Sequence, residues 1–197
     1  MTSEVEVSVP LTRFKQIFER VVAAGVKHPN AMSVSTVGES GQPSTRMVLL
    51  KDYDPRGFTF YTNLESRKGR QLKASPQAAL NFYWREIDVQ VCIEGPTESV
   101  SDEEADAYFA TRERGSQLGA WASLQSQPLS SRAHLLAEVA RVEARHLGRA
   151  VPRPPHWSGF RLLPERYEFW EAQAFRLHDR VLYERTSTGW TSTRLYP

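Results

Sequence analysis

Several features are missing from this sequence, and each absence excludes a class of protein. There is a single cysteine, Cys92, so the chain can form no internal disulfide, and no Cys/His cluster has metal-ligand spacing. No stretch approaches the roughly 18 apolar residues of a membrane-spanning helix. The opening MTSEVEVSVPLTRF lacks the basic and apolar segments of a signal peptide. We therefore expect a cytoplasmic protein with no metal site and no membrane contact.

Excess charge is also missing. Twenty-five Lys and Arg face 23 Asp and Glu, which gives a net charge of +2 and no strong basis for binding nucleic acid. The cations gather in a few places without an aromatic stacking platform, which also disfavours nucleic acid. The length of 197 residues suits one domain with its own core, so we expect a single domain over 1–197 whose first ten residues are flexible.

What the sequence does contain is mostly β-strand. The spacing of apolar residues and turn signals predicts a helix over 11–24, five closely spaced strands, three helices, a rigid Pro-rich connector at 151–157 and three more strands. The first strands are expected at 31–37, 44–53, 57–63, 78–84 and 88–95, the helices at 102–112, 115–123 and 131–147, and the last strands at 158–163, 166–173 and 176–185, before a closing WTSTRLYP. The fold class is α+β, a mainly antiparallel β-barrel of roughly six to eight strands with peripheral helices.

Two neighbouring segments place cations where an anion could bind. In RMVLLK, strand alternation puts Arg46 and Lys51 on opposite faces. In YTNLESRKGRQL, Ser66 is a good N-cap, so Arg67 and Lys68 fall in the first helical turn, where acidic residues are normally preferred. Free N–H groups with two cations suit a phosphate, although a solvated Arg/Lys pair explains the same pattern.

A third cluster lies in YFATRERGSQLGAWASLQSQ. Tyr108, Arg112 and Ser116 follow one another at four-residue spacing, so they share one helical face. A phenol, a guanidinium and a hydroxyl together suit a phosphate or carboxylate, but an ordinary surface Tyr–Arg contact is the simpler interpretation of this segment alone.

The fourth cluster is RLHDR, within the predicted strand 176–185. Alternation puts Arg176, His178 and Arg180 on one face, with Leu177 packed and Asp179 in a structural contact on the other. Three potential cations on one face require an anion. Alternation in VQVCIEG predicts that Cys92 is a small buried core residue and not a nucleophile.

Together these motifs resemble the pyridoxine/pyridoxamine 5′-phosphate oxidase family. The matching pieces, in order, are RMVLLK, FYTNLESRKGRQL, NFYW, QVCIEG, YFATRERGSQLGAWASLQSQ, PRPPHWSGFRL, EFW and RLHDR, and they cover nearly the whole chain. The resemblance implies an FMN-binding split barrel and a homodimer with flavin at the interface. It also implies oxidation of pyridoxine or pyridoxamine 5′-phosphate to pyridoxal 5′-phosphate, with O2 reduced to H2O2.

Residue roles follow from the resemblance, position by position. The FMN contacts fall on Arg46, Met47, Val48, Leu49, Leu50, Lys51, Tyr61, Thr62, Arg67, Lys68, Gln90, Gln125, Ser126, Trp170 and Arg180. The substrate-phosphate contacts fall on Lys51, Tyr108, Arg112 and Ser116, while Arg176 and His178 face the pyridine ring as the catalytic pair.

The sequence departs from the family pattern at a few positions. Val89 replaces an arginine before Gln90, His28 replaces an acidic residue, and EAQAF replaces a more polar stretch. These departures leave two alternatives open: a split-barrel flavin oxidase of another small aromatic substrate, of the phenazine-pathway type, or a non-catalytic protein that carries flavin or pyridoxal phosphate.

Overall fold

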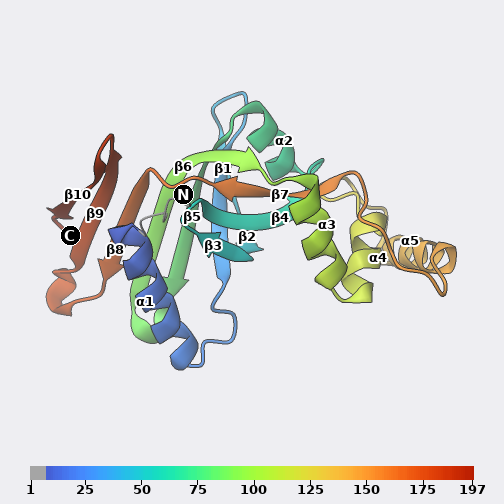
Figure 1. The fold of residues 1–197 in the computed structure, drawn as a ribbon. Coiled ribbons are helices and arrows are strands. Elements are labelled where there is room, and N and C mark those ends of the chain that lie inside the picture. Colours follow the sequence, from blue (N-terminus) through green and yellow to red (C-terminus); the bar gives the residue numbers. More distant parts are fainter. Residues whose placement is uncertain (1–7) are drawn as a thin grey trace, which may run out of the picture.

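The structure, a computed structural model, describes residues 8–197 and shows ten strands and five α-helices within that range (Figure 1). In chain order the elements are α1 (Val9–Ala23), β1 (Ala31–Val37), β2 (Pro43–Leu49), β3 (Asp52–Asp54), β4 (Gly57–Asn63), α2 (Arg67–Ala74), β5 (Gln77–Trp84), β6 (Val89–Ser99), α3 (Asp102–Thr111), α4 (Arg114–Ala122), α5 (Arg132–Arg145), β7 (Trp157–Leu162), β8 (Arg166–Glu171), β9 (Asp179–Thr186) and β10 (Gly189–Leu195). Two 3-10 turns lie at Arg85–Ile87 and Ala174–Arg176.

Every strand pairing is antiparallel, and the strands form one curled sheet. The main path runs β10-β9-β8-β6-β5-β1-β2, and a second path runs β3-β4-β7. The long strand β6 joins them, because its first part pairs with β5 and β8 while Thr97–Ser99 pair with β7. The predicted class, a mainly antiparallel half-closed barrel with peripheral helices, is confirmed, with ten strands in place of six to eight.

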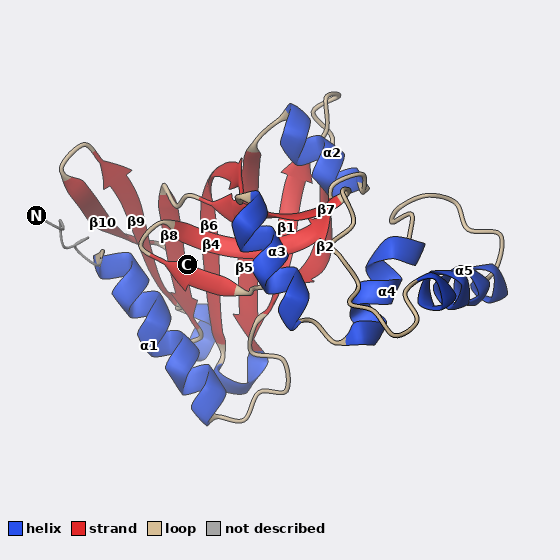
Figure 2. Cartoon of the chain, turned by 45° about the vertical axis from the view of Figure 1, so that its right-hand side comes forward, coloured by secondary structure: helices blue, strands red, loops and turns tan. Residues whose placement is uncertain are grey.

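The core lies inside the curl and is closed on one side by α1 (Figure 2). Leu11, Phe14, Ile17 and Val21 recur at helical spacing and are all buried. Phe14 packs edge-on against Phe58, with ring centroids 4.9 Å apart. Helix α3 lies over β7, and α4 and α5 pack together beyond it at the end of the molecule away from β9 and β10 (Figures 1 and 2).

The predicted strand 44–53 is wrong in one respect, because the chain changes pairing partner in its middle. Strand β2 pairs with β1 and β3 pairs with β4, with Leu50 and Lys51 between them. The Leu50 N–H donates to Asn30 O at 2.8 Å, and the Lys51 N–H donates to Thr59 O at 2.9 Å. The segment STRMVLLKDY contains no glycine or proline, so the sequence gives no turn signal at this transition.

The predicted strand 176–185 needs a larger correction. Strand β9 begins at Asp179, and Ala174–Arg176 form a 3-10 turn with positive φ at Phe175 (58°) and Arg176 (62°). The inference that three cations share one strand face is therefore wrong. Leu177 is 67% exposed in the protomer, so its predicted packing is wrong too. Asp179 does have a structural partner, Arg194, at 3.0 Å.

Other expectations have mixed outcomes. Helix α1 begins at Val9, so only the last part of the segment expected to be flexible is helical, and residues 1–7 lie outside the described residues.

Cys92 is half-buried on the outer face of β6, not in the core, and burial raises the pKa of its thiol to about 11. None of the helices within 8–197 is long and apolar enough to cross a membrane.

Candidate functional site

The largest group of predicted site residues meets in a cleft of about 650 Å³. Strands β4 and β7 form its floor, and α3, α4 and the start of α2 surround it. The cleft is lined by Met47, Val48, Leu49, Lys51, Tyr61, Thr62, Asn63, Lys68, Tyr108, Arg112, Glu113, Ser116, Gly119, Ala120, Ser123, Gln125 and Trp157. Segments far apart in the sequence therefore converge here, as the motifs predicted.

The first cationic group lies at the start of α2. Ser66 caps the helix as predicted, because its hydroxyl accepts the Gly69 N–H at 3.2 Å. Lys68 is only 7% exposed and donates to Thr62 Oγ1 (3.0 Å) and Gln125 Oε1 (2.8 Å), both neutral acceptors. Burial, with a smaller contribution from Arg46, lowers the pKa of Lys68 from 10.5 to about 8.

Arg46 extends this group from the neighbouring strand. Its guanidinium donates to Thr36 Oγ1 at 2.7 Å and to Val34 O at 3.1 Å, and reaches Gln71 of α2. Burial and the charge of Arg67 both lower the pKa of Arg46. Among the described residues no carboxylate forms an ion pair with Arg46, Arg67 or Lys68. Three mutually repelling cations without a counter-charge indicate a site for an external anion.

Lys68 gives a pH-dependent prediction. A phosphate ester stays dianionic above its second pKa of about 6, so above pH 7 only the lysine should titrate. We expect phosphate-ligand affinity to fall about tenfold between pH 7 and pH 9, because the ligand-free lysine loses its proton near pH 8. Titration of the protein with FMN, followed by flavin fluorescence, measures this. The Lys68→Arg variant should show a flat profile, and an equally flat wild-type profile would contradict the prediction.

The same lowered pKa has the opposite effect on folding. Between about pH 8 and pH 10.5 the unfolded chain binds more protons at Lys68 than the folded chain does. Stability therefore rises with pH in this window for the ligand-free protein. Binding of the anion and folding thus favour different protonation states of one side chain.

The second cationic group faces the first across the cleft. Arg112 follows α3 and is half-buried, with its guanidinium 4.8 Å from the Trp157 ring centre. Its Nη1 is buried without a hydrogen-bond partner, and burial lowers its pKa. Lys51 Nζ lies 5.7 Å from the Tyr108 ring centre. A buried, unsatisfied guanidinium nitrogen is costly and marks the place of a missing acceptor.

Helix geometry differs here from the sequence-based expectation. Helix α3 ends at Thr111, Arg112 has extended backbone angles, and Ser116 belongs to α4. Tyr108, Arg112 and Ser116 do not share one continuous helix, yet all three line the cleft. The non-helical residues between α3 and α4 change the direction of the chain, and the three side chains therefore reach the same cleft.

Trp157 is a cleft residue that our reasoning from sequence did not assign. Its ring stacks parallel to Tyr61 (5.2 Å between centroids), and Tyr61 stacks on Tyr108 at 4.2 Å. Gly159 makes room for this column, since a Cβ there would lie 2.8 Å from the Tyr61 ring. The role of Trp157 could have been inferred from strand alternation in PRPPHWSGFRL, which places Trp157, Gly159 and Arg161 on one face of the strand.

A further set of predicted residues lies elsewhere, on strands β6, β8 and β9. Gln90 pairs in register with Trp170, and Trp170 with Arg180, so the three side chains form a row across the outer face of the sheet. Arg180 is held by Glu168 at 2.7 Å. This pairing gives Arg180 a counter-charge within its own chain.

Arg176 and His178 extend this row beyond the end of β9. The His178 ring lies 4.5 Å from the Trp170 ring, and its Nδ1 accepts the Gln173 N–H at 3.2 Å. Nδ1 is thus an acceptor, which leaves Nε2 to face a ligand. Arg176 is exposed, with a left-handed backbone that is rare outside glycine.

One protomer therefore does not bring all the predicted residues together. The cleft lies beside α3 and α4, while β9 and the Ala174–Arg176 turn lie at the opposite end of the sheet (Figure 1). Residues of the predicted set that do not line the cleft are Arg46, Leu50, Arg67, Gln90, Ser126, Trp170, Arg176, His178 and Arg180. Of these, Leu50 is in the core, and Ser126 lies in the loop after Gln125 with a φ of 72°.

Comparison with known families gives matches along nearly all of the chain. Residues 18–146 match the family described as pyridoxamine 5′-phosphate oxidase, and residues 157–197 match the pyridoxine 5′-phosphate oxidase C-terminal dimerisation region. A Myxococcus xanthus protein named pyridoxine/pyridoxamine 5′-phosphate oxidase is 60% identical over 188 residues, covering 95% of this chain and 91% of that protein. The protein of that name from Rubrobacter xylanophilus is 53% identical, with 95% and 87% covered.

Solved structures show the same architecture. PhzG from Burkholderia lata, in complex with tetrahydrophenazine-1-carboxylic acid, superposes with a TM-score of 0.91 at 36% identity, covering 100% of this chain and 98% of that one. A pyridoxamine 5′-phosphate oxidase-related, FMN-binding protein from Nostoc punctiforme gives a TM-score of 0.77 at 16% identity, covering 98% and 100%, which shows a shared fold alone.

Proposed function

The chain belongs to the pyridoxamine 5′-phosphate oxidase family, and on that premise we propose that it is an FMN-dependent oxidase of pyridoxamine 5′-phosphate, pyridoxine 5′-phosphate or both. The product is pyridoxal 5′-phosphate, and with the amine substrate one water is consumed and one ammonia is released. The observation that supports this most directly is that Lys68 on one side of the cleft, and Lys51 and Arg112 on the other, have no carboxylate partner among the described residues. Two phosphate-bearing ligands, a flavin and a substrate, require such cations on both sides.

The residues at the start of α2 fit the phosphate of FMN. Lys68, Arg46 and Arg67 would supply the positive charge, and the first-turn N–H groups of α2 would add donors. Thr62 and Gln125, which now satisfy Lys68, would share its hydrogen bonds with the ligand. The fit rests on the chemistry of these donors and on their lack of anionic partners.

The opposite side of the cleft fits the substrate phosphate. Arg112 has an unused, buried Nη1, and Lys51, Tyr108 and Ser116 add an ammonium and two hydroxyls. A guanidinium binds phosphate in two-point geometry, which orients the pyridine ring as well as holding it. Binding at this distant phosphate restricts the substrate to the few orientations in which its C4′ can react.

The outer-face row completes the site from a second copy of this chain. A homodimer, for which the C-terminal dimerisation region provides the basis, would place the partner subunit's Arg176 and the partner subunit's His178 over the cleft. Arg176 would cover the substrate, and the free Nε2 edge of His178 would hydrogen-bond its polar substituent. The flavin, when bound, would supply the redox chemistry, a two-electron oxidation of the substrate with O2 as the final acceptor and H2O2 as its product.

A second candidate function shares the fold and the flavin but has another substrate. The likeness to PhzG, with its bound carboxylic acid, favours a flavin oxidase of a different small aromatic acid. A carboxylate could occupy the place beside Arg112, so the residues on this side of the cleft could bind either a carboxylate or a phosphate. The full set of Lys51, Tyr108, Arg112 and Ser116 in one cleft favours a phosphate.

One experiment tests these functions together. The purified protein is mixed with FMN, its visible spectrum is recorded, and pyridoxamine 5′-phosphate is added in air while H2O2 and pyridoxal phosphate are followed. We expect a yellow protein and one H2O2 per product. A protein that takes up no FMN would exclude both oxidase functions. A yellow protein inactive on both phosphorylated vitamers would favour the aromatic-acid alternative or a non-catalytic carrier.

A further inference from the structure

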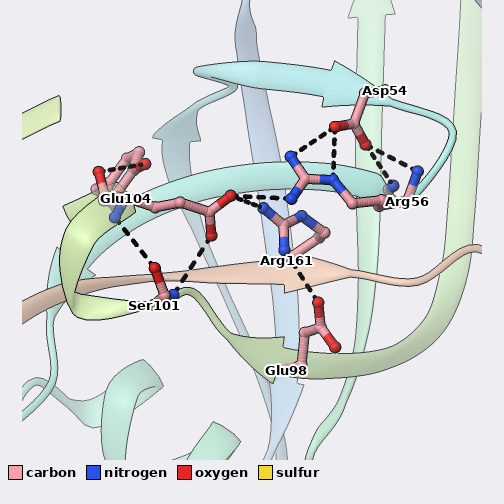
Figure 3. Close-up of polar contacts among 8 residues, drawn as sticks. Asp54, Arg56, Glu98, Ser101, Glu104 and Arg161 are labelled. Carbon is pink, nitrogen blue, oxygen red and sulfur yellow. Dashed lines mark hydrogen bonds and ion pairs between the residues drawn. The ribbon is translucent and has the colours of Figure 1, made fainter. Parts of the chain in front are cut away.

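Outside the cleft, a network of five charged side chains ties the start of α3 to the sheet (Figure 3). Arg161 of β7 is only 5% exposed and pairs with Glu104 of α3 at 2.7 Å and with Glu98 of β6 at 3.0 Å. Arg56, in the turn before β4, pairs with Glu104 at 3.0 Å and with Asp54 at 2.7 Å. Glu104 is therefore the only member on α3, and both arginines reach it.

Glu104 also completes the cap of its own helix. The Ser101 hydroxyl accepts the Glu104 N–H at 3.1 Å, and Glu104 Oε2 accepts the Ser101 N–H at 3.3 Å. Burial by itself would raise the pKa of Glu104, but the hydrogen bonds from Arg161 and from the Ser101 N–H bring it below the usual value. The carboxylate is thus ionised at neutral pH and available to both guanidinium groups.

The position of Glu104 on the helix links this network to the cleft. Glu104 and Tyr108 are four residues apart, so they project on one side of α3, and Arg112 follows directly after the last residue of the helix. Each has its partner on the floor: Glu104 contacts Arg161, Tyr108 stacks on Tyr61, and Arg112 lies over Trp157. Arg161 and Trp157 lie at opposite ends of this part of β7, and Tyr61 of β4 lies between them beside Gly159, so the order of the three contacts along α3 is reversed along the floor.

The spacings of the two elements match. The seven helical steps from Glu104 to Thr111 rise about 10 Å and the extended step to Arg112 adds about 3 Å, while the four strand steps from Trp157 to Arg161 span about 13 Å. A helix held at one end by ion pairs is therefore in register with the aromatic floor at the other end. The stacked rings are mostly non-directional, so they resist sliding along the floor less than charged hydrogen bonds do. Arg153 provides a second charged link, since it pairs with Asp102 and Asp106 of α3 and donates to Trp157 O, but unlike Arg161 it does not belong to the sheet.

We propose that Glu104, through its ion pairs with Arg161 and Arg56, is a positioning residue that sets the register of α3 and so places Tyr108 and Arg112 for the substrate's anionic group. It touches neither ligand and acts only through the helix. This inference rests on the proposed function, since it assigns Glu104 to the substrate side of that cleft. The residues proposed for the flavin phosphate lie on α2 and β2, whose side chains this network does not contact.

The test compares two isosteric variants of the same network. Glu104→Gln keeps an oxygen for the Ser101 N–H, and glutamine is itself a capping-box residue, so the helix start is preserved while the ion pairs are lost. Glu98→Gln removes the other Arg161 pair without touching α3. We expect Glu104→Gln to raise KM for pyridoxamine 5′-phosphate about tenfold, with kcat and FMN affinity within about threefold, and Glu98→Gln to leave KM unchanged.

Two further measurements separate positioning from a general loss of structure. In an Arg112→Ala background, Glu104→Gln should add little further change in KM, because both act through the same contact. Arg56→Met removes one exposed ion pair of Glu104 and should raise KM less, without unfolding the protein. Equal KM changes for the Glu104 and Glu98 variants, or a fall in kcat with unchanged KM, would overturn the proposal.

Hydrogen exchange keeps this inference distinct from the proposed function. In flavin-free protein, amides in α3 should exchange faster in Glu104→Gln than in Glu98→Gln, whatever the substrate proves to be. If wild type binds no FMN or oxidises no phosphorylated pyridine, the proposed function fails while this comparison still reports on α3. Unchanged exchange in α3 would refute the positioning role even in a fully active oxidase.

Discussion

Replacing Arg176 with alanine should slow turnover by about a hundredfold while the protein remains fully loaded with flavin. Arg176 is exposed, has a left-handed backbone, and has no ion-pair partner among the described residues. A side chain so placed contributes little to the stability of its own protomer, so its loss should affect the reaction and not the fold. Turnover is measured as pyridoxal phosphate formed, and flavin content as the visible absorbance per protomer.

A second exposed arginine serves as the control for the loss of a positive charge. Arg185 also lies on the β8–β9 hairpin and is exposed, but it is far along the strand from the Ala174–Arg176 turn. Arg185→Ala should retain wild-type turnover. If Arg176→Ala instead releases the flavin, the assignment of Arg176 to the substrate and Arg180 to the cofactor is wrong.

Mixing two impaired variants, assayed at substrate concentrations well below their KM, should restore about a quarter of wild-type activity. Arg112→Ala damages the cleft, and Arg176→Ala damages the outer-face row, which lies at the opposite end of the sheet (Figure 1). If each site combines the cleft of one protomer with the row of its partner, a hybrid dimer has one intact site of two. When equal amounts pair at random, about half of the dimers are hybrids. Since each hybrid has one intact site of two, about a quarter of all sites are intact.

A second mixture provides the matched control. Lys51→Ala and Arg112→Ala both damage the cleft, which a single protomer forms, so their hybrids contain no intact site. This mixture should remain as inactive as its components. Recovery is measured after the two variants, with different affinity tags, are unfolded together and refolded. Equal activities for both mixtures would show that the site is not shared between protomers in this way.

Local features of the fold were predictable because local chemistry determines them. The Ser66 cap is present as the sequence predicted, since it depends on residues within one turn. The convergence of Lys51, Tyr108, Arg112 and Ser116 on one cleft was predicted from motifs and is observed.

Features that depend on contacts between distant parts of the chain were harder to predict from the sequence. The change of pairing at Leu50 and Lys51 leaves no trace in hydropathy, because both residues remain extended. The turn at Phe175 and Arg176 contains neither glycine nor proline, so alternation alone extended the strand through it. Separation of the cleft from the outer-face row is a property of the whole sheet, which no motif encodes.

The change of pairing partner at Leu50 also fixes the distance between the backbone positions of Arg46 and Lys51. Arg46 and Lys51 belong to one extended stretch whose N–H groups are bonded to different strands, so about 16 Å of backbone separates their positions and cannot stretch or shorten. Substitutions on either side can strengthen or weaken the hold on one anion. Under the proposed function, an insertion or deletion between the two residues would therefore change the separation of the two phosphate sites, and so the combined length of flavin and substrate that the protein accepts.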